Sequence, residues 1–289
     1  VGTEGKILFA QNINNLISQN AYVFVLATGM LLCILTGGNI DLSVGSVGCF
    51  VGGIGAVMMA NGTNMILAVI VMLVIGLLVG MFQGFWIAYI KVPPFIATLA
   101  GMYAFRGLSN VVLQGYAVSV TDTAFLNIFG GGAECYVPDF FGGETMNMTC
   151  VIAGVLIAAL YVLITMKNRV SRKKKGYETG SLTGDLVRVI VIGALIIWLF
   201  YKLANFRGIS AALIWIAFIL LVYSYITSKT TIGRYLYAVG GNEKATRLSG
   251  VNTKKIYFFA YANMGLLAGL AGILTIARAA SAQPPYGQG

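Results

Sequence analysis

The chain has 289 residues, of which 58% are hydrophobic and only 10% are charged, and its formal net charge is +10. Its mean hydropathy of +0.85 leaves too little polar surface to cover a water-soluble globule of this length, so the composition predicts a multi-pass membrane protein. A chain this basic can bind nucleic acid, but here the basic residues lie in loops between apolar runs, where they act as topology signals. We therefore exclude nucleic acid as a partner and expect contact with membrane lipid.

The first twenty residues are polar, with asparagines interleaved among Leu8, Ile13, Leu16 and Ile17. This pattern predicts a short amphipathic helix at the membrane interface. The chain begins without Met, carries no signal peptide with a cleavage site and ends in a polar loop, so we expect further segments beyond both ends.

Apolar runs then predict an all-α bundle of about eight membrane segments, which we take as one domain over residues 1–289. The runs begin near residues 21, 44, 65, 95, 151, 186, 209 and 257. Three of them carry glycines spaced four apart, which lets helix backbones approach closely. These glycines are Gly48 and Gly52, then Gly76, Gly80 and Gly84, then Gly265 and Gly269.

Charged residues in the loops predict the orientation of the chain. The loop 115–150 contains four acidic residues and no Lys or Arg, so we place it on the extracytoplasmic side. The loops 167–185 and 228–255 are both basic, and the positive-inside rule places them in the cytoplasm.

A glycine-rich, polar break at residues 37–46 separates the first two apolar runs and carries Asp41. A charge at bilayer depth costs about 2.5 kcal/mol or more, so one interpretation is that Asp41 lines a path through the membrane. The other is that glycines end one helix and Asp41 or Ser43 caps the next. The two are compatible, since broken helices at transporter sites expose such helix ends.

Arg106 lies in the middle of a moderately apolar run and either lines the pore or reaches the headgroups. Our candidates for the translocation path are Asn39, Asp41, Ser43, Ser46 and Arg106.

The four cysteines do not form a disulfide scaffold. Cys33 and Cys49 fit as packing residues, while Cys135 and Cys150 flank a polar loop, so a bridge between these two stays open. No cysteine spacing suits a metal site and the chain has no histidine, so we predict no metal.

Enzymatic motifs are also absent. The sequence has no Walker A pattern, no H-E-x-x-H and no nucleophile elbow, which argues against an enzyme and against a cofactor bound by this chain. Proton-coupled carriers usually bury several ionisable groups, whereas Asp41 is the one acid in the apolar runs or their tight break. Energy for uphill transport would then come from another subunit.

Residues 233–250 form a segment where such a subunit could bind. Asn242 suits an N-cap, Glu243 suits a first turn and Gly250 a stop, so we expect a short helix over residues 243–249. The alternative is a solvated loop anchored to the lipid surface. Our candidates for coupling are Asn242, Glu243, Lys244, Ala245, Arg247 and Leu248.

Three ordered motifs carry a resemblance over nearly the whole chain: residues 39–46 (NIDLSVGS), residues 94–102 (PFIATLAGM) with residues 105–108 (FRGL), and residues 233–250. The chain resembles the permeases of bacterial ATP-binding-cassette sugar importers of the ribose, xylose and galactose type, and is most similar to multiple-monosaccharide permeases.

The resemblance implies a monosaccharide path in the bacterial inner membrane and a homodimer or permease pair. It also implies a cytoplasmic ATPase that binds ATP and Mg²⁺, and an extracytoplasmic sugar-binding protein. Residues 233–250 would contain the coupling region, and further spans would lie before residue 1 and after Gly289. The competing class is an ion-coupled secondary carrier or facilitator that uses the Asp41 break as its own substrate site.

Overall fold

The computed structural model describes residues 8–143, 145–177 and 181–287, so Glu144 of the acidic loop lies outside the described residues. The chain divides into two compact units. The first contains Val1–Ile17 and Tyr136–Ser210, and the second contains Ser18–Cys135 and Ala211–Gly289. Each unit is described by itself.

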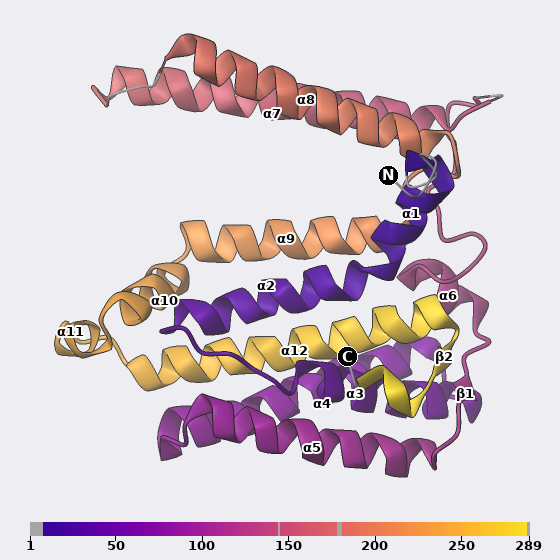
Figure 1. Ribbon diagram of the computed structural model, residues 1–289, viewed down its shortest axis with the longest axis vertical. Helices are drawn as coiled ribbons and strands as arrows, with labels where there is room; N and C mark the ends of the chain where they lie inside the picture. Colours follow the sequence, from indigo (N-terminus) through magenta and orange to yellow (C-terminus); the bar gives the residue numbers. More distant parts are fainter. Residues whose placement is uncertain (1–7, 144, 178–180, 288–289) are drawn as a thin grey trace, which may run out of the picture. The chain divides into compact units, whose positions relative to one another are not determined.

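The second unit contains most of the helices and one small sheet (Figure 1). Its long helices are α2 (Ala21–Leu35), α3 (Val44–Ala60), α4 (Met65–Phe85), α5 (Pro94–Leu113), α9 (Ala211–Lys229) and α12 (Thr253–Ala279). Its shorter elements are the π-helical turn η2 (Trp86–Ile90), α6 (Thr123–Phe129), α10 (Thr231–Gly241), α11 (Glu243–Leu248) and the 3-10 turn η3 (Pro284–Gly287). The strands β1 (Val118–Ser119) and β2 (Ser281–Ala282) pair antiparallel.

Helix α12 is the central element of this unit, packed against α2, α3 and α4 (Figure 1). In its most apolar stretch 78% of the residues are buried, against 28% in the span formed by α4 and η2. Glycine makes this packing possible, because a Cβ on Gly76 would lie 2.7 Å from the carbonyl oxygen of Gly265 and one on Gly80 would lie 2.8 Å from Cα of Gly265. The prediction of close backbone approach at these spaced glycines is confirmed.

We expect Gly76→Ala to lower the melting temperature of the purified protein in detergent. The added methyl group has no room beside the Gly265 carbonyl, and overpacking of this kind costs about 1–3 kcal/mol. Gly107→Ala on α5 is the matched control, since no heavy atom lies within 4 Å of a Cβ there. Equal stability of the two variants would contradict the close packing of α4 on α12.

The first unit contains most of α1 (Ala10–Gln19) and an antiparallel pair, α7 (Met148–Lys174) and α8 (Leu182–Ala204). The loop before α7 is organised by Asp139, whose carboxylate accepts hydrogen bonds from backbone N–H groups. The N–H of Gly143, at 2.8 Å, contributes most to lowering the pKa of Asp139 below its usual range, and the N–H groups of Met148 and Phe141 lower it further. The loop is therefore held by a carboxylate that stays ionised in mildly acidic solution.

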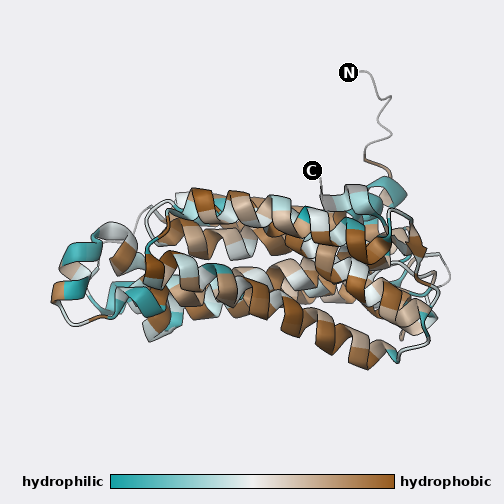
Figure 2. Ribbon diagram, turned by 90° about the horizontal axis from the view of Figure 1, so that it is seen from below, coloured by the Kyte–Doolittle hydropathy of each residue, from teal (hydrophilic) through white to brown (hydrophobic). Residues whose placement is uncertain are grey.

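All eight predicted apolar runs form helices, each beginning within four residues of its predicted start. Within the described residues, six helices are long and apolar enough to cross a membrane, or seven spans if α1 and α2 count as one. Helix α3 is shorter, with 17 residues. Figure 2 shows apolar residues along the long helices and hydrophilic residues mainly at the helix ends and in the turns. The prediction of an all-α, multi-pass membrane protein is confirmed.

The four cysteines are free thiols. Cys135 belongs to the second unit and Cys150 to the first, and each is a buried thiol within its own unit. Cys150 lies in the first turn of α7, where its thiol is 3.4 Å from the carbonyl oxygen of Phe200 on α8 and donates a hydrogen bond to it.

Candidate translocation and coupling site

The break between α2 and α3 turns back into the helices of the second unit. Gly37 and Gly38 adopt left-handed φ angles of 111° and 80°, which favour glycine, and the chain then runs without regular structure as far as α3. The backbone N–H of Asp41 donates to Sδ of Met30 at 3.4 Å. Because Met30 lies five positions before the end of α2, Asp41 lies alongside α2 and not beyond its end (Figure 1). Hydropathy alone could not decide this depth.

Asp41 is only 3% exposed, and one of its carboxylate oxygens, Oδ1, accepts two hydrogen bonds from Ser43. The donors are the backbone N–H at 2.8 Å and the hydroxyl at 2.6 Å. Ser43 is the N-cap residue of α3, so the carboxylate fixes the turn that starts this helix. Both interpretations of Asp41 therefore remain compatible, because the same carboxylate is buried and supports a helix start.

Gln83 on α4 extends this buried polar cluster. Its Nε2 donates to the Ser43 hydroxyl at 2.9 Å, and Gly101 on α5 faces the same pair. Sequence reasoning did not select Gln83, although a lone amide in the longest apolar run was a signal for it. The cluster joins the break to α4 across 40 positions of sequence.

The other predicted path residues lie in the break, on α3 and on α5. Asn39 is half-buried and donates to the carbonyl oxygen of Thr36 at 3.2 Å, and Ser46 is buried in the first turn of α3. Arg106 is half-buried on α5, five residues beyond Gly101. The structure thus brings Asp41 and Ser43 into contact, and a role for each residue in transport stays a prediction.

The predicted short helix is present as α11. The Asn242 side chain caps it by accepting the N–H of Ala245 at 2.9 Å. Its inner face is held by Thr246, which is buried and donates to the carbonyl oxygen of Ala238 on α10 at 2.8 Å. On its outer face Ala245 is exposed and Leu248 is 86% exposed. The helix therefore presents its apolar side chains to the outside of this chain.

Glu243 ties α11 to two other elements. Its carboxylate accepts hydrogen bonds from the Thr253 hydroxyl at 3.1 Å and the Tyr257 hydroxyl at 3.2 Å, both on α12. Nζ of Lys91, in the turn before α5, lies 3.6 Å from Glu243 and also 5.6 Å from the centre of the Tyr257 ring. We name these four residues the Glu243 cluster. The sequence predicted Glu243 in the first turn of a helix and as a coupling candidate, but not these contacts with Lys91, Thr253 and Tyr257.

Helix α10 in turn packs on the start of the break. A Cβ on Gly240 would lie 3.5 Å from the backbone nitrogen of Gly37. The coupling segment and the broken helix therefore belong to one continuous set of contacts. Over the described parts of the chain, no group of three His, Cys, Asp or Glu side chains is placed to hold a metal ion.

Comparison with known proteins gives the family of the chain. A family model described as "Branched-chain amino acid transport system / permease component" matches residues 12–289. The xylose transport system permease protein XylH of Escherichia coli (strain K12) is 36% identical over 291 residues, which cover 99% of this chain and 70% of that protein. XylH of Haemophilus influenzae is 34% identical over 289 residues, covering 100% of this chain and 74% of that protein.

The ribose import permease protein RbsC of Escherichia coli (strain K12) is 31% identical over 278 residues, which cover 96% of this chain and 65% of that protein. No solved structure matches the chain. These matches confirm the resemblance carried by the three sequence motifs and the prediction of a transport subunit in place of an enzyme. The chain belongs to this family of bacterial permease components and is a multi-pass membrane protein.

Proposed function

We propose that the chain forms the translocation path for monosaccharides in an ATP-driven importer. The observation that carries this proposal is α11, a short capped helix that exposes Leu248 and Ala245 while the Glu243 cluster joins it to the membrane helices. A helix built in this way suits docking to a separate ATPase and transmitting its movement. The names of the relatives, which specify xylose and ribose, support a monosaccharide as the substrate class.

The partners follow from this assignment. A cytoplasmic ATPase binds ATP and Mg²⁺, an extracytoplasmic sugar-binding protein delivers the substrate, and a second permease completes the pore as a homodimer or a permease pair. The path residues are Asn39, Asp41, Ser43, Ser46 and Arg106, and the coupling residues are Asn242, Glu243, Lys244, Ala245, Arg247 and Leu248.

The proposed orientation places residues 115–150 outside and residues 228–255 in the cytoplasm. We expect a cysteine introduced at Phe140 to react with a membrane-impermeant thiol reagent in intact cells, because that side chain is 73% exposed in the loop before α7. A cysteine at Ser181, which precedes α8, should react only after the membrane is opened. Labelling of Ser181→Cys in intact cells would reverse the proposed orientation.

Sugar uptake into proteoliposomes distinguishes an ATP-driven importer from a secondary carrier. The buried carboxylate of Asp41 is the observation that favours the carrier, since such a group can bind a coupling ion. We expect D-xylose uptake into proteoliposomes to require ATP, the ATPase and the binding protein together. Uptake by the permease alone, driven by a proton or sodium gradient, would favour the carrier instead.

A further inference from the structure

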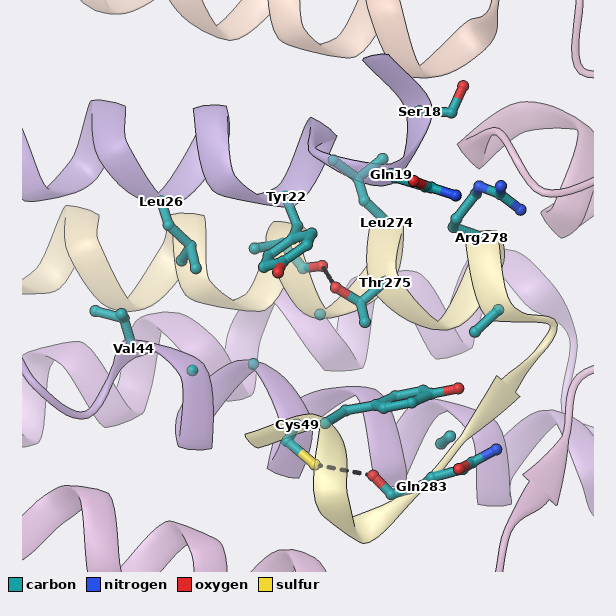
Figure 3. A pocket seen from close by; sticks show the side chains of 17 residues that line it. Ser18, Gln19, Tyr22, Leu26, Val44, Cys49, Leu274, Thr275, Arg278 and Gln283 are labelled. Atoms are coloured by element: carbon teal, nitrogen blue, oxygen red, sulfur yellow. Dashed lines mark hydrogen bonds between the residues drawn. The ribbon is translucent and has the colours of Figure 1, made fainter. Parts of the chain in front are cut away.

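A cavity of about 360 Å³ lies within the second unit, between the end of α1, helices α2, α3 and α12, and the segment after β2 (Figure 3). None of the five residues predicted for the translocation path is among those that line it. Its lining includes the polar side chains of Gln19, Tyr22, Thr275, Arg278 and Gln283 and the thiol of Cys49. Its volume falls in the range of about 300–1,000 Å³ that is usual for small-molecule sites.

The cavity is mostly apolar but holds polar groups without protein partners. Within residues 8–143, 145–177 and 181–287, the side chains of Gln19, Tyr22 and Arg278 form no hydrogen bond or ion pair. The Thr275 hydroxyl donates to the carbonyl oxygen of Ala271 at 2.8 Å, which leaves its oxygen free to accept a hydrogen bond. Figure 3 shows Gln19, Tyr22, Thr275 and Arg278 arranged around this space from three different helices.

This chemistry suits an uncharged molecule with many hydroxyl groups. The guanidinium of Arg278 and the amide of Gln19 can donate to hydroxyl oxygens, and the Tyr22 ring offers a flat apolar surface to the C–H face of a sugar ring. No Asp or Glu is among the described residues that line the cavity, so the ammonium group of a free amino acid would have no countercharge. The lining therefore favours a sugar over an amino acid.

The cavity also adjoins the broken helix. Val44 and Gly45, in the first turn of α3, form part of its wall and directly follow the turn that Asp41 fixes. A change in the break would therefore alter the shape of the cavity. This position suits a site that must bind a substrate and then release it.

We propose that this cavity is a monosaccharide-binding site of the permease, in which Gln19 and Arg278 bind sugar hydroxyls and Tyr22 covers the ring. The proposal rests on the proposed function and adds the place where the substrate is held.

Cys49 provides the test, because it is half-buried and lines the cavity, whereas Cys33, Cys135 and Cys150 are buried. The full-length permease with its ATPase, in nanodiscs, is treated with N-ethylmaleimide in the presence of D-xylose, D-ribose, D-galactose or L-leucine. We expect one of the sugars to slow alkylation of Cys49 about tenfold when present at ten times its Kd, and L-leucine to have no effect. A Cys49→Ala variant should take up no reagent.

Substitutions in the lining test whether Arg278 and Tyr22 contact the sugar that protects Cys49. Arg278→Ala and Tyr22→Ala should each raise the sugar concentration needed for half-protection, whereas Arg188→Ala on the exposed side of α8 should leave it unchanged. Unchanged protection in both Arg278→Ala and Tyr22→Ala would overturn the proposed contacts.

The outcomes separate this proposal from the proposed function, since alkylation needs no ATP. ATP-driven sugar uptake with no protection of Cys49 by any sugar would overturn the cavity site and leave the importer intact. Protection by L-leucine alone would overturn the monosaccharide assignment. Protection by a sugar in a permease that shows no ATP-driven uptake would support the site and contradict the importer.

Discussion

Replacement of Leu248 by Asp is expected to abolish copurification of the permease with its ATPase. Leu248 and Ala245 lie three residues apart on one face of α11 and both are exposed in this chain, which is the arrangement needed for an apolar contact with a partner. A carboxylate buried there without a partner costs about 3–5 kcal/mol, which corresponds to a loss of about a hundredfold or more in affinity. Copurification and sugar-stimulated ATP hydrolysis measure the effect.

Lys244→Ala is the control for this experiment. Lys244 is exposed on the same helix, but its charge would lie at the rim of the contact, where substitution changes affinity little. The folded state of α11 should survive both changes, because its cap and its inner face depend on Asn242 and Thr246. If the Leu248→Asp variant is inserted normally, copurifies with the ATPase and keeps its sugar-stimulated ATP hydrolysis, α11 is not the coupling helix.

Replacement of Asp41 by Asn is expected to reduce sugar uptake by about tenfold or more while leaving the fold intact. The amide oxygen of Asn can still accept the N–H and the hydroxyl of Ser43, so the turn that starts α3 is preserved. What is lost is the negative charge, which lies buried alongside α2. Uptake into proteoliposomes and the melting temperature of the purified protein measure the two effects separately.

Asp41→Ala is the matched variant, because it removes the charge and the acceptor together. It should lower the melting temperature as well as uptake, since a hydrogen bond to a charged group contributes about 1.5–3 kcal/mol. Normal uptake by a normally expressed Asp41→Asn variant would leave Asp41 with a capping role only.

The local features of this fold could be predicted from the sequence because they depend on neighbouring residues. The cap at Asn242 and the stop at Gly250 require only the residues of one turn, and Gly250 has the left-handed φ angle of 89° that such a stop uses. The spaced glycines predicted close packing for a similar reason, because glycines four apart form a helix face without side chains, which lets another backbone approach.

Contacts between distant segments could not be predicted in this way. The Glu243 cluster joins Lys91 to a residue 152 positions later, and Cys49 contacts the carbonyl oxygen of Gln283, which lies 234 positions away. The cavity could not be predicted for the same reason. Tyr22 lies far from Thr275 and Arg278 in the sequence, and the three line one cavity only because α2 packs on α12. The depth of Asp41 could not be predicted either, because it is fixed by the contact between Asp41 and Met30 of α2.

Helix α12, although central in its unit, follows α2, α3 and α4 in the chain and is therefore made after them. Helix α4 ends at Phe85 and α12 begins at Thr253, 168 positions later, so at about 5–20 residues per second the ribosome needs roughly ten to thirty seconds to supply the helix that α2, α3 and α4 surround. During this interval the glycines that pack on α12, among them Gly48, Gly76 and Gly80, lack that partner. A chain shortened before Thr253 would lack this packing partner permanently.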